Sequence, residues 1–168
     1  NLRQLFNANY LDFHEVDLAF IVNELLEIIE PTLESKKILL TKNMSKGIKV
    51  LGDSIQIQQL LINLFNNAID AISTSNTRSR EIKLSIAAEA RFAVIKIEDS
   101  GTGINPELIP SIFELFKTTK KDGLGVGLWL SQTIIHKHHG AIAAANSTKG
   151  GAIFTIQIPL IQSSHEQS

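Results

Sequence analysis

Apolar residues recur every three or four positions in three stretches of the chain, which is the pattern of helices with one buried face. The first stretch predicts a helix near residues 17–35, with Asp17 as its N-cap. The second predicts a helix over 53–74, which has the most regular apolar face. The third predicts a helix over 127–139, and Gly140 is well placed to end it.

Runs of β-branched residues and leucine predict strands between and after these helices. They lie near residues 37–42, 47–51, 81–88, 91–98, 141–146 and 152–160. The first two are expected to pair through a turn at 43–46, and the next two to form an antiparallel hairpin. The second hairpin strand is apolar on both faces, which indicates a central place in a covered sheet. The order of elements predicts an α+β two-layer sandwich, with a mixed sheet of about five strands packed against three main helices.

Local signals mark helix ends and one long loop. Asp53 and Gln56 resemble a capping box, and Pro31 is expected to kink or weaken the first helix. Residues 100–124 contain five glycines or prolines and little periodicity, apart from a segment at 108–116 that is compatible with a short helix. A loop of this length is expected to be functional.

Size and composition exclude several classes of function. The 168 residues suit a single domain. Sixteen basic and seventeen acidic residues leave a formal charge of -1, so nothing in the overall charge favours nucleic acid or an anionic membrane as a partner. The chain has no cysteine, which excludes disulfides and thiolate metal sites and fits a reducing compartment. The cytoplasm is therefore the expected location.

No apolar run approaches the roughly 20 residues that cross a bilayer, and the start of the chain lacks the pattern of a signal peptide. Direct membrane contact is therefore not expected. The chain begins at Asn1 rather than Met, which suggests that it was cut from a longer polypeptide. A membrane span or a sensor could lie in the missing part. Residues 1–15 are interpreted as the end of a preceding helix and a linker, 16–161 as one domain, and 162–168 as a disordered tail.

A cluster of polar residues lies within the second predicted helix. Asn63, Asn67 and Asp70 are spaced so that they share one face of it. Asparagine is a mediocre helix former because its amide competes for backbone hydrogen bonds. The cluster is either the polar edge of an exposed face or a ligand site, in which Asn67 offers its carbonyl oxygen to Mg²⁺.

Asp99 ends an apolar strand and is followed by Gly101 and Gly103. A carboxylate at this place can accept a hydrogen bond from the N6 amino group of adenine, whereas guanine presents an acceptor at that edge and would be repelled. The glycines would let the backbone approach a flat base. The alternative is an aspartate that caps a turn.

Gly123, Gly125 and Gly127 lead directly into the third predicted helix, whose first backbone N–H groups suit phosphates. The spacing is not that of the dinucleotide fingerprint, and the chain has no Gly-x-x-x-x-Gly-Lys-Ser/Thr loop. A simple glycine-rich turn is the alternative. Hydroxyls, cations and aromatic anchors for this loop are present nearby at Phe113, Phe116, Thr118, Thr119, Lys120 and Lys121.

Five motifs occur in a fixed order along the chain. They are the asparagine box Asn63-Leu-Phe-Asn-Asn67-Ala, the first glycine box Asp99-Ser-Gly-Thr-Gly103, the phenylalanine box Ile112-Phe-Glu-Leu-Phe116, the lid with a second glycine box from Thr118 to Leu128, and the closing motif Gly150-Gly-Ala-Ile-Phe154. From residue 17 to 160 the chain resembles the ATP-binding domain of sensor histidine kinases, in the GHKL superfamily that also holds gyrase, a large heat-shock chaperone and mismatch-repair ATPases.

The resemblance implies ATP and Mg²⁺ as cofactors and a left-handed ATP-binding sandwich as the fold. It assigns Mg²⁺ to Asn67, the adenine amino group to Asp99, the phosphates to the backbone of 123–127, and a lid to residues 104–126. The nucleotide contacts that it implies are Asn63, Asn67, Asp70, Asp99, Gly101, Gly103, Ile104, Phe116, Thr118, Thr119, Lys120, Lys121, Gly123, Leu124, Gly125, Val126, Gly127, Leu128 and Thr155.

Catalytic roles are implied for Asn63, Asn67 and Lys120. Many sensor kinases have a lysine three residues after the metal asparagine, where this chain has Asp70, so the resemblance gives the phosphate cation to Lys120 or Lys121. The hydrolytic relatives have a glutamate at the position of Asn63. An amide cannot take a proton as a general base, so Asn63 disfavours hydrolysis.

The resemblance implies that the phosphate acceptor is a histidine on a separate dimerisation domain of the same parent protein, followed by the receiver domain of a response regulator. His14 lacks the sequence pattern of that acceptor and is interpreted as a linker histidine, with residues 1–15 as the end of the dimerisation helix. His136, His138 and His139 are interpreted as solvated residues at a helix end. The alternatives are a conformational ATPase of the gyrase type and a nucleotide-responsive module without catalysis.

Overall fold

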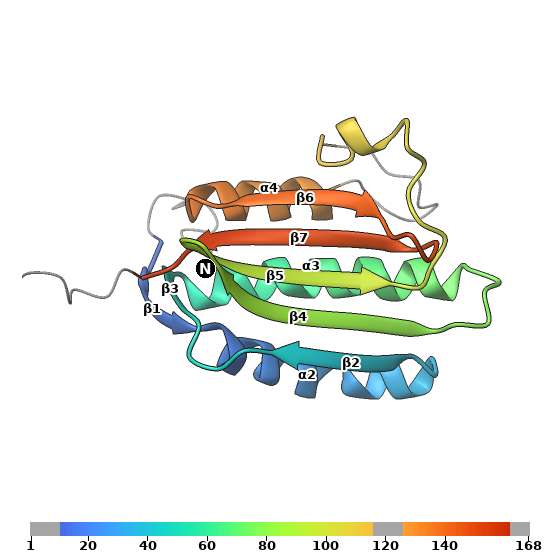
Figure 1. Ribbon diagram of the computed structural model, residues 1–168, viewed down its shortest axis with the longest axis horizontal. Helices are drawn as coiled ribbons and strands as arrows, with labels where there is room; N and C mark the ends of the chain where they lie inside the picture. The colour runs from blue at the N-terminus through green and yellow to red at the C-terminus, as the bar shows by residue number, and fades with distance from the viewer. Residues whose placement is uncertain (1–10, 116–125, 162–168) are drawn as a thin grey trace, which may run out of the picture.

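A five-stranded sheet with helices on one face forms the body of the molecule (Figure 1), in a computed structural model that describes residues 11–115 and 126–161. Its elements are β1 (His14–Asp17), α2 (Leu18–Ser35), β2 (Leu39–Met44), β3 (Lys49–Gly52), α3 (Ser54–Ser73), β4 (Glu81–Glu89), β5 (Phe92–Asp99), the 3-10 turn η1 (Ile109–Ser111), α4 (Gly127–Lys137), β6 (Ala141–Asn146) and β7 (Ala152–Pro159). The strand order is β2-β4-β5-β7-β6, and only the β2–β4 pair is parallel. The predicted two-layer α+β sandwich is confirmed.

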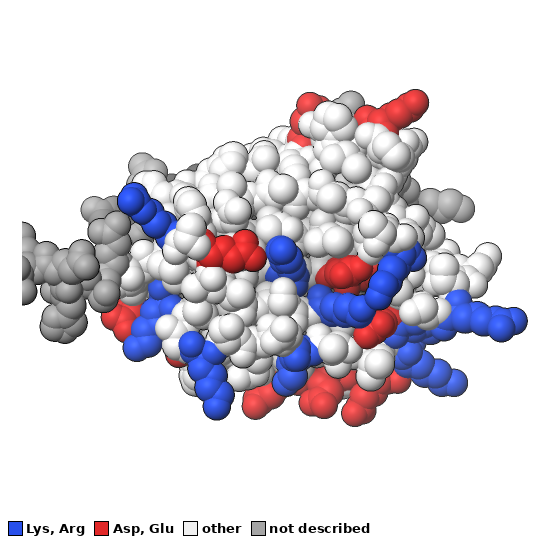
Figure 2. Space-filling view, viewed as in Figure 1, with Lys and Arg blue, Asp and Glu red and all other residues white. Residues whose placement is uncertain are grey.

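Alternation along the strands places the core between the sheet and the helices. In β7 every second residue is buried, from Ala152 to Ile158, and the partly exposed residues between them face away from the helices. In β5 the buried residues Ile95 and Ile97 put Asp99 on the helix side, while Lys96 is exposed. Figure 2 shows that charges of both signs are scattered over the open side of the sheet. The strand β5 is central as predicted, but helices cover only one of its faces; on the other face Val94 is buried, whereas Phe92 and Lys96 are exposed.

The prediction that the first two strands pair with each other is wrong. Strand β2 pairs in parallel with β4, whereas β3 pairs with β1 in a separate two-stranded antiparallel sheet. Contacts far apart in sequence fix the parallel register: the Leu39 N–H donates to the Arg80 carbonyl, and the Arg80 guanidinium donates to the Lys36 carbonyl. The strand β1 lies partly in the segment interpreted as a linker, because it begins at His14.

Aspartates cap the first two helices as predicted. The Asp17 carboxylate accepts from the Phe20 N–H at 3.2 Å, and one oxygen of Asp53 accepts from the N–H groups of Ile55 and Gln56 at 3.0 and 3.1 Å. The reciprocal half of the capping box is absent, because the Gln56 side-chain oxygen is buried without a hydrogen-bond partner in the described part of the chain. The cap is therefore one-sided.

The helix α2 continues through Pro31 to Ser35, which agrees with the predicted range 17–35. The expectation about the end of α4 is wrong. At the end of α4 the left-handed residue is His139, with φ of 59°, rather than Gly140. Gly140 is required for another reason, since a Cβ atom there would lie 2.1 Å from the Gln157 carbonyl oxygen. None of the helices in the described residues has the length and apolarity needed to cross a membrane.

His138 joins the end of α4 to the start of α3. Its side chain is 2% exposed and stacks on Phe13, with ring centroids 4.9 Å apart. The imidazole Nε2 accepts from the Asp53 N–H at 3.0 Å, so the proton is on Nδ1, which donates to the Ile134 carbonyl at 2.8 Å. His138 is thus a buried structural residue and not a solvated one, whereas His136 is exposed as expected.

Replacing His138 by leucine is expected to lower the free energy of unfolding by about 1–3 kcal/mol, because the Asp53 N–H would lose its acceptor in a partly buried place. Urea denaturation followed by circular dichroism measures the change. The matched control His136→Leu alters an exposed residue of the same helix and is expected to stay within about 0.5 kcal/mol of the parent protein. Equal losses in the two variants would contradict the role assigned to His138.

Candidate functional site

Asp99 is a buried carboxylate with one oxygen held in place. Its residue is 4% exposed, and its Oδ1 accepts from the Gly101 N–H at 2.8 Å and from the Ala152 N–H at 3.3 Å. Both recorded hydrogen bonds use Oδ1, which leaves Oδ2 as an acceptor for another group. Burial raises the pKa of Asp99 above its usual value; the two N–H groups lower it in part, and nearby Glu98 raises it further.

Close backbone packing fixes the turn that follows Asp99. A Cβ atom on Gly101 would lie 2.7 Å from the backbone of Ala71, so this turn rests directly on α3. A Cβ atom on Gly151 would lie 1.7 Å from the Asp99 carbonyl oxygen, so β7 can approach only with glycine there. Gly103 has a φ of 76°, which glycine adopts without strain. These glycines therefore hold the turn against its neighbours.

Asn63 and Asn67 lie on the face of α3 that meets this turn. Both are half-buried and share a helix face with Ala71, the residue that Gly101 touches. Asn67 is one helical turn from that contact, about 6 Å along the helix axis. The Asn63 amide nitrogen is buried and has no hydrogen-bond partner in the described residues. Such orphaned groups are rare in proteins, and a bound ligand or an ordered water molecule can supply the partner.

The two remaining polar residues of this part of α3 are exposed. Asn66 and Asp70 are both exposed, and Asp70, which was predicted to contact the nucleotide, shares the helix face of Asn63 seven residues earlier. Asn66 is thus chemically identical to Asn67 and adjacent to it, yet exposed where Asn67 is half-buried. This difference provides a matched pair for mutagenesis.

Asn146, which the sequence analysis missed, holds the segment after the turn. Its side-chain oxygen accepts from the Ile104 N–H and its amide donates to the Ile104 carbonyl, both at 2.7 Å. Further along, Phe113 packs edge-to-face on Phe154 of β7, with ring centroids 6.3 Å apart, which confirms Phe113 as an anchor. The predicted helix near 108–116 is reduced to the 3-10 turn Ile109–Ser111.

Within the described residues, no side-chain cap is present at the start of α4. Its N-cap, Val126, makes no side-chain hydrogen bond to the first turn, and a Cβ atom on Gly127 would meet no atom within 4 Å. Leu128 is half-buried and packs against the core. The helix packs against α3, which carries Asn63 and Asn67. Its open N-terminus is suited to negatively charged groups.

One residue that was predicted to contact the nucleotide, Thr155, lies away from Asp99, Asn63 and Asn67. Thr155 pairs with Lys96 in the register between β5 and β7, on the open face of the sheet and opposite to the side of Asp99. The other predicted contacts that cannot be placed lie outside the described residues: Phe116, Thr118, Thr119, Lys120, Lys121, Gly123, Leu124 and Gly125.

The residues present fit a hard cation that is held mainly by its nucleotide. In the described ranges 11–115 and 126–161, no three His, Asp or Glu side chains are grouped as metal ligands. A cation at Asn67 would therefore take its other ligands from phosphates and water, as Mg²⁺ commonly does. The orphaned amide nitrogen of Asn63, on the same helix face, is a hydrogen-bond donor and is suited to a phosphate oxygen of that nucleotide.

Comparison with known proteins identifies the family. The model of the histidine kinase-, DNA gyrase B-, and HSP90-like ATPases matches residues 52–162. The chain belongs to this ATPase family. The matched range begins at the end of β3 and includes Asn63, Asn67, Asp99 and the start of α4. ATP binding is the property that the family shares.

Within the ATPase family the chain is similar to sensor kinases. The catalytic domain of the histidine kinase ThkA, also solved in complex with the response regulator protein TrrA, is 30% identical with a TM-score of 0.79, and the match covers 88% of this chain and 95% of that one. Sensor protein FixL of Bradyrhizobium diazoefficiens is 41% identical over 110 residues, which cover 66% of this chain. Sensor histidine kinase ZraS of Salmonella typhimurium is 35% identical over 161 residues, which cover 95%.

The chain is thus an ATP-binding catalytic domain of the two-component sensor histidine kinase type. It spans 22% of the length of FixL and 34% of the length of ZraS. The resemblance and fold inferred from the sequence are confirmed.

Proposed function

We propose that this domain binds Mg²⁺-ATP between α3 and the Asp99 turn and donates the γ-phosphate to a histidine on a separate dimerisation domain of the same parent protein. The observation that carries the proposal is the arrangement of Asp99: one carboxylate oxygen is fixed by backbone N–H groups, and the other is open to the adenine amino group. Asn67 lies one helical turn from the contact between this turn and α3.

The metal end of the site depends on Asn67 and the phosphate end on the start of α4. When bound, Mg²⁺ would neutralise charge on the phosphates. The half-buried amide of Asn67 supplies an oxygen ligand, and the uncapped N–H groups after Val126 face the triphosphate. Lys120 or Lys121 is proposed as the phosphate cation, together with the hydroxyls of Thr118 and Thr119.

Asn63 favours transfer over hydrolysis. Its amide can hold a phosphate oxygen or a water molecule by a hydrogen bond, but it cannot remove a proton from water. The γ-phosphate is therefore kept for an incoming imidazole nitrogen, which displaces ADP in line. Catalysis of this kind rests on positioning and charge neutralisation.

The partners and boundaries follow from the same proposal. A response regulator receiver domain would take the phosphate from the histidine, and ThkA has been solved in complex with such a protein. We propose 16–161 as the catalytic domain, 1–15 as the end of the dimerisation helix with its linker, and 162–168 as a tail. The cytoplasm is the proposed location.

Mixing the chain with the acceptor domain of its parent protein and γ-labelled ATP tests the proposal. The expected result is acid-labile, base-stable label on the acceptor domain, with little phosphate released by the chain alone. Absence of label on the acceptor would leave a nucleotide-responsive module as the function. Steady phosphate release that Asn63→Ala abolishes would instead support a conformational ATPase.

A further inference from the structure

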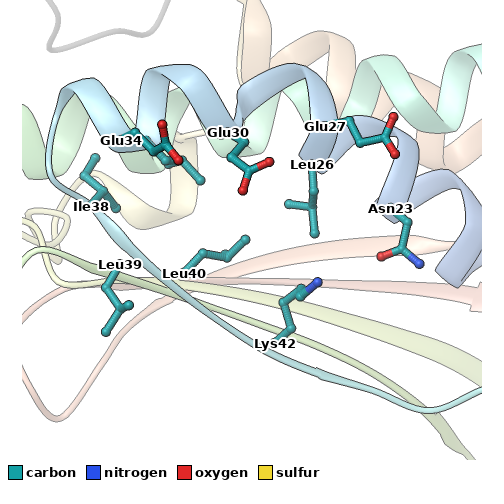
Figure 3. A pocket seen from close by; sticks show the side chains of 10 residues that line it. Asn23, Leu26, Glu27, Glu30, Glu34, Ile38, Leu39, Leu40 and Lys42 are labelled. Carbon is teal, nitrogen blue, oxygen red and sulfur yellow. The ribbon is translucent and has the colours of Figure 1, made fainter.

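A groove separates the helix α2 from the edge strand β2, on the side of the molecule away from α4 (Figures 1 and 3). It has a volume of about 500 Å³ and is lined by residues of both elements. Figure 3 shows Leu26 and Glu30 pointing from α2 toward the strand, while Leu40 and Lys42 lie between strand and helix. The groove has an apolar floor and a charged rim.

The free edge of β2 offers regular backbone hydrogen-bonding groups. The N–H groups of Leu39 and Ser45 donate to carbonyl oxygens on the β4 side at 2.8 and 2.9 Å. In a parallel pair alternate residues bond to the same neighbour, so Leu40, Lys42 and Met44 direct their N–H and C=O groups away from β4. No other strand of the described residues pairs with this edge. It is therefore open to an added strand.

The rim of the groove has an excess of negative charge. Glu27, Glu30 and Glu34 are exposed, lie on one side of α2 and line the groove. Within the described ranges these glutamates make no ion pair, and the lining of the groove contains one basic side chain, that of Lys42. Figure 2 shows acidic side chains along the lower border, where Figure 1 places α2 and β2. Like charges at this helical spacing repel one another, so a cationic partner would relieve the repulsion.

We propose that the groove binds an extended basic segment of a partner protein, which adds to β2 as a further strand of the sheet. The three carboxylates span about 10.5 Å along the axis of α2. Alternate residues of a strand are about 6.7 Å apart and point to the same side, so two or three Lys or Arg residues at alternate positions match the row of carboxylates. The residues between them lie on the open face beside Leu39, Thr41 and Asn43. Because Leu39 is 65% exposed, an apolar residue is suited to the position next to it.

The charge also selects against a second copy of this chain as the occupant. Pairing of two β2 edges would bring two rows of glutamates from Glu27 to Glu34 to the same junction, with only one Lys42 from each copy to offset them. A segment of alternating basic and apolar residues has the opposite charge and the same backbone geometry. This mode of recognition takes affinity from main-chain hydrogen bonds and selectivity from alternate side chains.

A fluorescein-labelled, capped peptide of four Lys-Val repeats serves as the probe, with fluorescence anisotropy as the readout for the complete chain. Saturable binding is expected, and it should weaken about tenfold when Glu27, Glu30 and Glu34 are all changed to Gln. A control variant has the same change in net charge at three exposed glutamates outside the groove: Glu24, Glu89 and Glu107. This control is expected to bind the peptide nearly as well as the parent protein.

The variant Lys42→Pro tests the strand edge separately. The Lys42 N–H points away from β4, so proline removes one donor for the partner and leaves the β2–β4 ladder intact. Binding is again expected to fall about tenfold, from the lost main-chain hydrogen bond and the lost pairing geometry. In the parent protein, the peptide is expected to slow amide hydrogen exchange at Leu40, Lys42 and Met44.

Three outcomes would overturn the proposal. The first is evidence of unspecific attraction. This would be either a peptide of the same composition, with all lysines at one end, that binds as well as the probe, or a control variant that loses as much affinity as the groove variant. The second is unchanged exchange at the β2 edge on peptide addition. The third is a dimer of the chain in sedimentation experiments that Lys42→Pro dissociates, since a second copy would then be the occupant.

Discussion

Asp99→Asn is expected to weaken ATP binding by roughly 10- to 100-fold. The reason lies in the two backbone N–H groups that bind Oδ1, those of Gly101 and Ala152. They require an oxygen at that position, so the amide nitrogen of the variant must occupy the outer one. A donor would then face the adenine amino group, which is also a donor. Isothermal titration of the chain with ATP and Mg²⁺ measures the loss.

The neighbouring Glu98→Gln is the matched control. It makes the same change in charge one residue away, on the opposite face of β5, where the Glu98 carboxylate accepts from the Ser147 hydroxyl. Its ATP affinity is expected to match that of the parent protein. The assignment of Asp99 fails if both variants lose affinity equally, or if guanosine nucleotides bind to the parent protein as well as ATP does.

The variant Asp99→Asn is expected to be at least as stable as the parent protein at pH 7. Burial raises the pKa of Asp99 in the folded state, so its ionised form is favoured less in the folded chain than in the unfolded one. The resulting destabilisation is present above the raised pKa and disappears as the pH falls through it toward the ordinary value. Urea denaturation should therefore show an advantage of Asp99→Asn that shrinks on acidification. A variant less stable at pH 7 would contradict this sign.

Asn67→Ala is expected to slow phosphate transfer to the acceptor domain by at least about 100-fold. Alanine removes the oxygen proposed to hold Mg²⁺, and the described residues offer no cluster of acidic or histidine ligands in its place. The affinity for ATP should also stop responding to Mg²⁺, whereas binding of metal-free ATP should change little. Transfer of label from γ-labelled ATP, and titrations with and without Mg²⁺, measure the two effects.

Asn66→Ala provides the control for this prediction. Asn66 precedes Asn67 on the same helix and is exposed, so the substitution has the same effect on helix propensity without touching the site. Transfer and Mg²⁺ dependence are expected to remain at the parent level. If Asn67→Ala keeps its Mg²⁺ response, or if Asn66→Ala loses it as well, then Asn67 is not the metal ligand.

The elements that could be predicted from the sequence are those whose signals are local. A run of β-branched residues predicts the strand β7, and Asp17 and Asp53 cap the helices that follow them. The partners of β2 and β3 depend on residues far along the chain, such as the contact between Leu39 and Arg80. Local patterns cannot specify such pairing, and the nearest strand was therefore chosen wrongly.

The site shows the same division. Asp99 and Asn67 are recognisable because they belong to two of the five motifs that occur in order along the chain. Asn146 was missed because its role appears only through Ile104, which is 42 positions away. For Thr155 a local signal existed: it is adjacent to the buried Phe154, and the alternation of a strand puts it on the opposite face.

The contact between Gly101 and Ala71 has a consequence for regulation. Because the backbone of the Asp99 turn is locked onto α3, the purine end of the proposed pocket exists before a nucleotide arrives. ADP has the same purine as ATP and would gain the same contacts there, so the product competes for the site it has just left. If the domain binds ATP as proposed, the fraction of sites that hold ATP is therefore expected to depend on the ratio of the two nucleotides.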